Sequence, residues 1–442
     1  MTKIHAHTLV EAAPRVSRAT YRRAALTGGV IGNYVDQVNI FLPALALAPA
    51  MKTLAGPSAA SSGTAIVVMA MLLGRPVGAT VFGRIADRAG RTRTTAVAIA
   101  GTAACTLLIA ALPTHRVLGG ATFALLVALR FVGGMFIAGE YSAAVPLAME
   151  WSAPRHRGLF SGLIMAMAPC AQATIAFVTA GMLMALGPES YAAWGWRLPF
   201  VAGGLASCAM FVFYRRHVAD ATRAVRPGID EAGTRGSLRE VVLGPWRGAF
   251  WRMFCLMSGL WLMTQMVVLL LGQRLVSDAG LSAGRASVVM GFASVGQALV
   301  MALTGHLSTL VGRRRYFLFA TTIAAVGGSA AWLWMMGTGP GLVGLIVGAV
   351  LAQVLTVTAY GPVGAYLSEA FPAHVRSTGY GTAYSASIVL PALYPYWLPW
   401  LAGGTSRNAA VVLVLIAGSA LVSLGAALGP RLAPAEIEQV AV

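Results

Sequence analysis

The chain has 442 residues, of which 57% are hydrophobic and only 10% are charged. Soluble domains carry about 25% charged residues, so this composition excludes a disordered chain, a collagen-like fibre and a disulfide scaffold. It predicts a polytopic membrane protein. The net charge of +18 alone would suggest nucleic-acid binding. Such high hydrophobicity excludes that partner, and the excess of Lys and Arg that membrane proteins carry in cytoplasmic loops accounts for the charge.

Twelve apolar stretches are long enough to cross a bilayer, since a spanning helix needs about 20 apolar residues. The longest polar stretch, 218–248, follows the sixth of them and predicts a cytoplasmic linker between two six-helix halves, 1–217 and 249–442. The predicted spans lie near 24–49, 62–83, 95–113, 119–149, 157–184, 197–217, 249–272, 286–308, 316–337, 341–367, 378–401 and 409–430.

The basic residues fall mostly on one side of these spans. With the N-terminus in the cytoplasm, 24 of the 32 Lys and Arg residues lie in cytoplasmic tails, loops and helix ends, and 6 lie on the opposite side. Cytoplasmic loops of membrane proteins are enriched in Lys and Arg. The distribution therefore predicts an even number of spans and two cytoplasmic termini.

An internal repeat supports the division into halves. The loop after the second span, 83–93, reads GRIADRAGRTR, and the loop after the eighth, 305–315, reads GHLSTLVGRRR, 222 residues later. A second echo relates the Glu–Pro–Arg pattern of 150–157 to that of 369–376 at nearly the same offset. Parallel six-helix repeats place a substrate cavity between the halves near the middle of the bilayer.

The 83–93 loop resembles the signature G-x-x-x-D-R-x-G-R-[KR] of the major facilitator superfamily. Several further segments are similar to its metabolite:proton symporters: RPVG at 75–78, RFVGGMFIAGE at 130–140, GWRLPF at 195–200, EAFP at 369–372 and RSTG at 376–379. The resemblance implies an all-α fold of twelve transmembrane helices in two pseudo-symmetric six-helix bundles. It also implies transport of small metabolites such as proline, betaines or α-ketoglutarate, usually with protons.

Three positions depart from that pattern. The first span reads Asp36-Gln37-Val38-Asn39, whereas the family usually carries two acids three residues apart. Gly133 replaces a usual Gln, and Thr309 stands where the repeat would place an Asp. The missing second acid makes a transporter without proton coupling an alternative.

Two acids lie deep in predicted spans, and we expect them to carry protons. Asp36 is the leading candidate and Glu140 the second. A charge near the bilayer centre costs at least about 2.5–3.5 kcal/mol, so each acid must face a partner or a wet cavity. The alternative for Asp36 is a fixed ion pair with Arg75 or Arg130. Both functions are compatible within one transport cycle.

Substrate contacts are predicted mainly from polar residues inside spans. Arg130 can hold a carboxylate through two parallel hydrogen bonds, although a structural ion pair is an equal alternative. Arg75 is the second such arginine, for which a structural role is favoured. The remaining candidates for substrate binding are Gln37, Asn39, Tyr360 and Tyr384.

The charged loop at the end of the second span predicts a conformational latch, in which ion pairs hold one side of the transporter closed. Turns are expected at Gly83 and Gly90. The alternative, a topology anchor, is favoured for 313–315 because the matching acid is absent. The predicted latch residues are Gly83, Asp87, Arg88, Gly90, Arg91, Glu150, Arg157, Glu369 and Arg376.

These patterns together predict a secondary transporter and no enzyme, cofactor or metal site. We expect it to move a small carboxylate-bearing metabolite, either an organic acid or a zwitterion, across the bacterial inner membrane by proton symport and as a monomer. A proton-independent facilitator and a transporter-like nutrient sensor are the alternatives.

Overall fold

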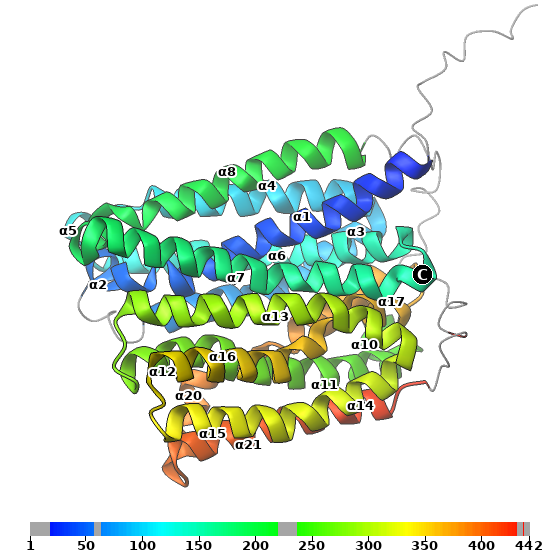
Figure 1. The fold of residues 1–442 in the computed structure, drawn as a ribbon. Helices are drawn as coiled ribbons and strands as arrows, with labels where there is room; N and C mark the ends of the chain where they lie inside the picture. Colours follow the sequence, from blue (N-terminus) through cyan, green and yellow to red (C-terminus); the bar gives the residue numbers. More distant parts are fainter. Residues whose placement is uncertain (1–17, 57–62, 220–236, 431–435, 437–442) are drawn as a thin grey trace, which may run out of the picture.

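The computed structural model describes residues 18–56, 63–219, 237–430 and 436, and its regular elements are all helical (Figure 1). The helices of the first half of the chain pack together into one bundle. Its elements are α1 (Arg18–Leu45), η1 (Ala48–Ala50), α2 (Met51–Ala55), α3 (Gly63–Ala89), α4 (Arg91–Ala110), α5 (His115–Leu118), α6 (Gly120–Trp151), α7 (Pro154–Ser190), η3 (Tyr191–Gly195), α8 (Arg197–Phe213) and η4 (Tyr214–Ala219).

The second half forms a matching bundle below the first in the view of Figure 1. A short helix, α10, also occurs within the predicted linker, where the Ser237 side chain accepts a hydrogen bond from the Glu240 backbone at 3.1 Å. The elements are α10 (Leu238–Val242), α11 (Arg247–Thr264), η6 (Gln265–Leu270), α12 (Leu271–Ser277), α13 (Ala283–Val311), α14 (Arg313–Ile323), η7 (Ala324–Gly328), α15 (Ser329–Gly337), α16 (Gly341–Val357), η8 (Thr358–Tyr360), α17 (Val363–Glu369), α18 (Arg376–Ala386), α19 (Val389–Ala392), α20 (Tyr394–Gly403) and α21 (Arg407–Ala427).

Eleven helical segments of the described chain are long and apolar enough to cross a membrane, one fewer than the twelve predicted spans. The difference lies at 378–401, which the sequence predicts as one span. The structure divides this stretch into α18, α19 and α20. Pro391 and Pro395 each lack a backbone donor and disfavour a helical conformation in the preceding residue, which explains the interruption.

The two bundles meet through closely packed helices. Figure 1 shows α7 and α13 side by side along the middle of the molecule. A side chain at Gly305 of α13 would overlap the backbone of Gly158 and Gly162 in α7. Small residues allow membrane helices to approach this closely. Further along the same pair, the rings of Phe177 and Phe292 meet edge to face with centroids 5.5 Å apart.

The internal repeat has a structural counterpart at two glycines. Gly90 separates α3 from α4 with φ of 91°, and Gly312 separates α13 from α14 with φ of 94°. Both values lie where a Cβ is strained, so each position requires glycine. Gly83, where the sequence predicts a turn, instead lies inside α3. There its missing side chain admits Thr378 of α18, whose Cα would be 3.3 Å from an added Cβ.

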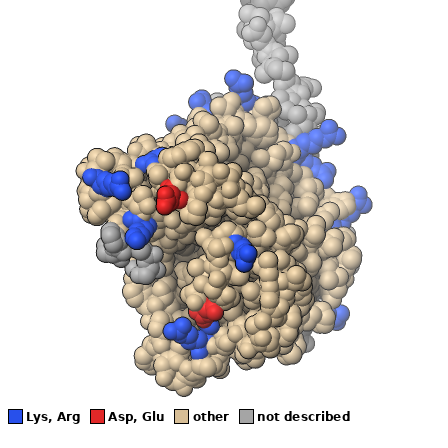
Figure 2. Space-filling view, turned by 60° about the vertical axis from the view of Figure 1, so that its left-hand side comes forward, with Lys and Arg blue, Asp and Glu red and all other residues tan. Residues whose placement is uncertain are grey.

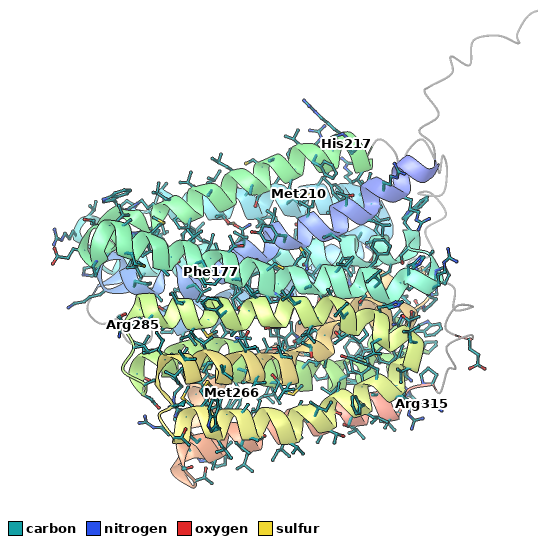
Figure 3. The ribbon with its side chains drawn as sticks, in the orientation of Figure 1. Phe177, Met210, His217, Met266, Arg285 and Arg315 are labelled. Carbon is teal, nitrogen blue, oxygen red and sulfur yellow. The ribbon has the colours of Figure 1, made fainter. Side chains whose placement is uncertain are left out.

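The two ends of the bundles differ in charge. The end at which α1 begins is called the arginine-rich end, and the other the opposite end. Figure 3 shows Arg315 at the former and Arg285 at the latter. Figure 2 turns the opposite end forward and shows its basic side chains scattered singly, with few acidic ones. The arginine-rich end carries Arg22, Arg23, Arg84, Arg88, Arg93, Arg155, Arg157, Arg215, Arg216, Arg239, Arg247, Arg252, Arg313, Arg314, Arg315 and Arg376.

Candidate functional site

A central cavity of about 80 Å³ lies between the two bundles. A larger cavity of about 660 Å³ adjoins it and shares Phe41, Leu72 and Leu269 with its lining. The larger cavity reaches Pro49 and Ala283 near helix ends at the opposite end. The space next to the central cavity therefore extends toward that end.

Arg75 of α3 lines the central cavity and is the one charged side chain among the described residues that do so. Its guanidinium carbon lies 5.4 Å from the ring centroids of Tyr141 and Trp261 and 5.3 Å from that of Tyr384. Cation–π contacts of this kind stabilise a desolvated arginine. The Nε and Nη2 atoms of Arg75 have no hydrogen-bond partner among the described atoms. Two donors of a planar fork are thus left for a ligand.

The two predicted proton carriers lie against each other behind this cavity. Asp36 of α1 and Glu140 of α6 are buried, and their carboxyl groups lie close enough to share a hydrogen bond. A hydrogen bond between two carboxyl groups requires a proton on one of them. Gly32, one turn before Asp36, leaves room for Glu140, whose Oε1 would be 3.0 Å from an added Cβ. Arg75 is near enough to interact electrostatically with Asp36.

Asn39 and Arg130 lie inside the first bundle and do not line the central cavity. The Asn39 amide donates to the backbone of Val35 and to Ser207, both at 2.9 Å, and its oxygen accepts from Thr106 at 2.8 Å. Arg130 donates to the Asn39 backbone oxygen at 3.0 Å. These contacts join α1 to α4, α6 and α8 within the first bundle.

The other predicted contacts line the cavity. Gln37 donates to the Tyr141 hydroxyl at 3.1 Å, and both side chains belong to the lining. Tyr384 stacks on Tyr141 with ring centroids 4.9 Å apart. Tyr360 accepts a weak hydrogen bond from Thr264 at 3.4 Å.

Sequence reasoning did not select Tyr141, Trp261 or Gln172 as lining residues. Trp261 occupies the cavity from α11 and donates its indole N–H to the Tyr384 backbone at 3.0 Å. Gln265 and Gln297, likewise not selected from the sequence, line the same cavity. Tyr141 directly follows Glu140 in the sequence. Its position next to a predicted proton carrier is the signal that could have indicated it as a site residue.

Reciprocal ion pairs join the bundles at the arginine-rich end. Arg157 of the first bundle lies 3.5 Å from Glu369 of the second, and Arg376 of the second lies 2.6 Å from Glu150 of the first. The repeat relates Glu150 to Glu369 and Arg157 to Arg376, so each pair is the pseudo-symmetric image of the other. Arg376 is oriented by its Nε, which donates to the Ser368 and Phe371 backbone at 3.1 Å.

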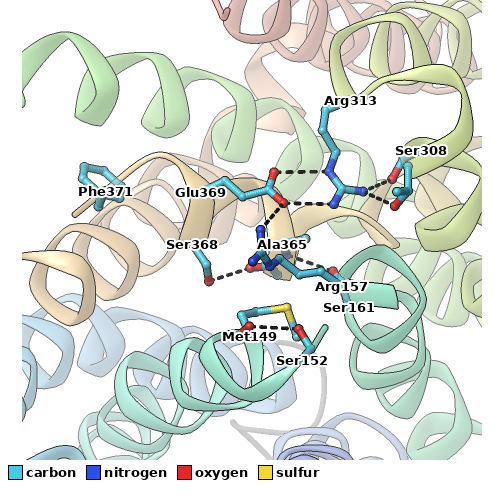
Figure 4. A network of polar contacts seen from close by, with 12 residues as sticks. Met149, Ser152, Arg157, Ser161, Ser308, Arg313, Ala365, Ser368, Glu369 and Phe371 are labelled. Carbon is cyan, nitrogen blue, oxygen red and sulfur yellow. Dashed lines mark hydrogen bonds and ion pairs between the residues drawn. The ribbon is translucent and has the colours of Figure 1, made fainter. Parts of the chain in front are cut away.

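Arg313 belongs to the same ion-pair cluster, which we define as Glu150, Arg157, Arg313, Glu369 and Arg376. Figure 4 shows Arg157 and Arg313 on either side of Glu369. The sequence favoured a topology anchor for this arginine. Its guanidinium is instead buried and contacts Glu369 at 3.0 and 3.3 Å, Ser308 at 2.6 Å and Thr309 at 3.0 Å. Thr309, where the repeat lacks an acid, is thus a hydrogen-bond acceptor for Arg313.

Ser161 makes a further contact between the bundles that the sequence did not indicate. Its hydroxyl donates to the Gly361 backbone at 2.7 Å and accepts from the Ala365 N–H at 3.1 Å. Pro362 interrupts the helix between these partners, so one side chain of α7 satisfies backbone groups that the interruption leaves free. The side chains of Asp87 and Arg91 lie outside the described part of the structure, and Arg88 is exposed at the end of α3.

A separate charged group joins α12 to α21 at the opposite end. Asp278 forms ion pairs with Arg274 and, at 3.9 Å, with Arg407, while Arg274 donates to Asn408 at 3.0 Å. Partial burial opposes ionisation of Asp278. Hydrogen bonding by Ser277 and the charge of Arg274 outweigh it and hold the pKa of Asp278 below its ordinary value.

Comparison with known proteins identifies the class to which this fold and these charged groups belong. A family profile described as the Major Facilitator Superfamily matches residues 30–275. The chain belongs to this superfamily. It is therefore a multi-pass membrane transporter rather than an enzyme, and the resemblance seen in its motifs is confirmed.

Several relatives cover most of the chain. The inner membrane metabolite transport protein YhjE of Escherichia coli (strain K12) is 27% identical over 425 residues, which is 91% of this chain and 93% of that protein. The alpha-ketoglutarate permease of the same strain is 27% identical over 329 residues, 73% of each chain. Its proline/betaine transporter is 25% identical over 394 residues, 86% of this chain and 77% of the relative.

A solved structure of the proton:xylose symporter XylE bound to 6-bromo-6-deoxy-D-glucose has the same fold. The TM-score is 0.69 at 15% sequence identity, and the match covers 93% of this chain and 95% of the XylE chain. The predicted architecture of two pseudo-symmetric helix bundles is thereby confirmed.

Proposed function

We propose that the protein is a symporter that carries a small organic monoanion together with one proton across the bacterial inner membrane. The observation that supports this most directly is Arg75, whose two unpartnered donors face a cavity with no other charged lining residue among those described. A carboxylate fits that planar fork through two parallel hydrogen bonds. The negative charge of the carboxylate would compensate the Arg75 guanidinium for the water molecules that it loses in the cavity.

The aromatic rings around Arg75 argue for an anion over a betaine. Tyr141, Trp261 and Tyr384 form the kind of cage that binds a quaternary ammonium group. Here the cage already holds the Arg75 guanidinium, so a second cation would meet like charge. Ile40, Leu72 and Met301 line the remaining wall, and favour a substrate with an apolar body. Alpha-ketoglutarate and proline or betaine, which the names of two relatives mention, mark the anionic and zwitterionic alternatives.

The position of Arg75 between the cavity and the carboxyl pair supports proton coupling. Its positive charge stabilises the ionised form of Asp36. A substrate carboxylate that binds Arg75 neutralises this charge, so Asp36 gains a proton when the substrate enters. Glu140 shares that proton through the carboxyl–carboxyl hydrogen bond. One monoanion and one proton then move together without net charge.

The ion-pair cluster supplies the gate of an alternating-access cycle. It closes the arginine-rich end in this structure, while the larger cavity extends to the opposite end. By the enrichment of Lys and Arg in cytoplasmic loops, we assign the arginine-rich end to the cytoplasm. The two bundles and the cavity between them belong to one chain, which supports a monomer as the working unit.

The test is transport in proteoliposomes with a pH indicator in the external medium. Adding a small monocarboxylate outside should alkalinise the medium with wild-type protein, and glycine betaine should not. Asp36→Asn should abolish pH-driven accumulation but retain counterflow, which needs no net proton movement. Glu189→Gln, which removes an exposed acid, serves as the matched control and should behave as wild type.

Three outcomes would overturn parts of this proposal. Carboxylate uptake with neither alkalinisation nor response to a proton uncoupler would establish a facilitator. Binding without flux would establish a nutrient sensor. Alkalinisation by glycine betaine, equal to that by the carboxylate, would contradict the assignment of the substrate as an anion.

A further inference from the structure

A third cavity, of about 490 Å³, lies at the arginine-rich end, within the second bundle and apart from the central cavity. Its walls come from the first turns of α11 and α14, from α17 and from the residues after α21. Arg252, Arg313 and Arg314 line it against one carboxylate, that of Glu369. A concave site with this charge excess concentrates anions.

Buried hydrogen-bond donors in this cavity lack partners among the described atoms. Tyr366 is 6% exposed, and its hydroxyl makes no hydrogen bond. The Nε of Arg252 is also buried without a partner, although its Nη1 donates to the Leu428 backbone at 3.3 Å. Leaving such donors unsatisfied is costly, and more so for a charged group. The donors therefore point to an acceptor that binds in the cavity.

The arrangement of the donors selects the chemistry of that acceptor. Arg252, Arg314 and Tyr366 approach the cavity from three different helices. A tetrahedral oxyanion can accept from several directions at once, and arginine is well suited to phosphate. Trp246, half-buried in the wall, has the polar and apolar faces of a residue at a membrane interface.

We propose that this cavity is a binding site for a phosphate group. The group can come from an anionic phospholipid headgroup, whose glycerol would lie along the apolar wall of Ala249 and Leu428, or from free phosphate. Arg313 connects the site to the ion-pair cluster because it lines the cavity and also holds Glu369 (Figure 4). The site does not depend on the substrate proposed above.

The test measures binding to the purified full-length protein, so it is independent of transport. The probes are inorganic phosphate and the water-soluble lipid dihexanoylphosphatidylglycerol, with dihexanoylglycerol as the phosphate-free control. Titration calorimetry of the wild type is compared with the double variant Arg252→Gln/Arg314→Gln. Arg315→Gln is the matched control, since Arg315 is exposed beside Arg314 and does not line the cavity.

We expect at least one phosphate probe to bind the wild type and the double variant to bind it roughly tenfold more weakly for each arginine removed. Tyr366→Phe keeps the shape of the wall and should weaken binding several-fold. This variant tests the site even if the double variant fails to fold. Binding of phosphatidylglycerol alone identifies a lipid site, and comparable binding of inorganic phosphate identifies a free anion. Absence of binding, or affinities that the cavity variants leave at the Arg315→Gln value, would overturn the proposal.

Discussion

Breaking one ion pair between the bundles should shift the protein from closed to open at the arginine-rich end. Arg376 and Glu150 are 2.6 Å apart, and their side chains are 3% and 13% exposed. Removing one partner of such a buried pair leaves the other charge uncompensated, at a cost of about 3 kcal/mol or more. Each 1.4 kcal/mol changes an equilibrium about tenfold, so Arg376→Gln should lower the ratio of closed to open protein roughly 100-fold.

Pulsed electron spin resonance between labels on exposed positions of the two bundles can measure this shift. Cysteines at Arg84 and Arg315, in a background without the native cysteines, place one label on each bundle. Arg376→Gln should move the distance distribution to longer values. Arg155→Gln is the control, because this exposed arginine at the same end should contribute about 0–1 kcal/mol.

A double-mutant cycle separates the energy of the interaction between Glu150 and Arg376 from the effects of changing each residue alone. Glu150→Gln combined with Arg376→Gln should be less disruptive than the sum of the single changes, since neither charge is then left alone. An unchanged distance distribution in folded Arg376→Gln protein would refute the gating function of the ion-pair cluster. So would strict additivity of the two substitutions.

Three further outcomes are expected. Arg75→Lys should weaken substrate binding about tenfold because lysine lacks the planar fork. Arg130→Lys should instead lower the thermal unfolding midpoint with little change in substrate affinity. Equal losses of affinity in the two variants would contradict this division of functions. Gly305→Leu should reduce the yield of folded protein by forcing α13 away from Gly158, measured by size-exclusion chromatography, and a normal yield would show that the contact is dispensable. Asp278 stabilises the fold at neutral pH, and this contribution is lost as the pH falls through its lowered pKa; Asp278→Asn should therefore flatten the acid side of a plot of unfolding temperature against pH.

The sequence predicted the helical architecture because long apolar stretches and basic loops are local signals. The repeat also indicated which loops correspond, and the structure shows Gly90 and Gly312 in the same conformation. The prolines at 391 and 395 are visible in the sequence, but the prediction of a single span over 378–401 does not take them into account. An apolar stretch of sufficient length was read as one helix, although prolines remove the hydrogen bonds that continuity requires.

The face of each helix that lines the cavity could not be predicted. In a membrane protein the lipid-facing surface is as apolar as the packed interior, so hydrophobic periodicity does not distinguish them. Arg75 and Arg130 consequently looked alike as buried cations in adjacent helices. Only the packing shows that Arg130 donates to Asn39 within the first bundle, whereas Arg75 reaches the cavity. The contribution of Arg313 was missed because an absent acid was weighted above the repeat.

Arg75 explains how chemistry confined to one bundle can control the contact between both. The carboxyl pair belongs to the first bundle, but the rings of Trp261 and Tyr384 that surround Arg75 belong to the second. Each cation–π contact in a dry site stabilises that interface by about 0.5–2 kcal/mol. A ligand shifts a conformational equilibrium only by what it gains in one state over another. In the function proposed above, a substrate carboxylate competes with these rings and with Asp36 for the same guanidinium. Its binding would then alter the proton affinity and the attraction between the bundles together, which is the linkage that a symporter requires.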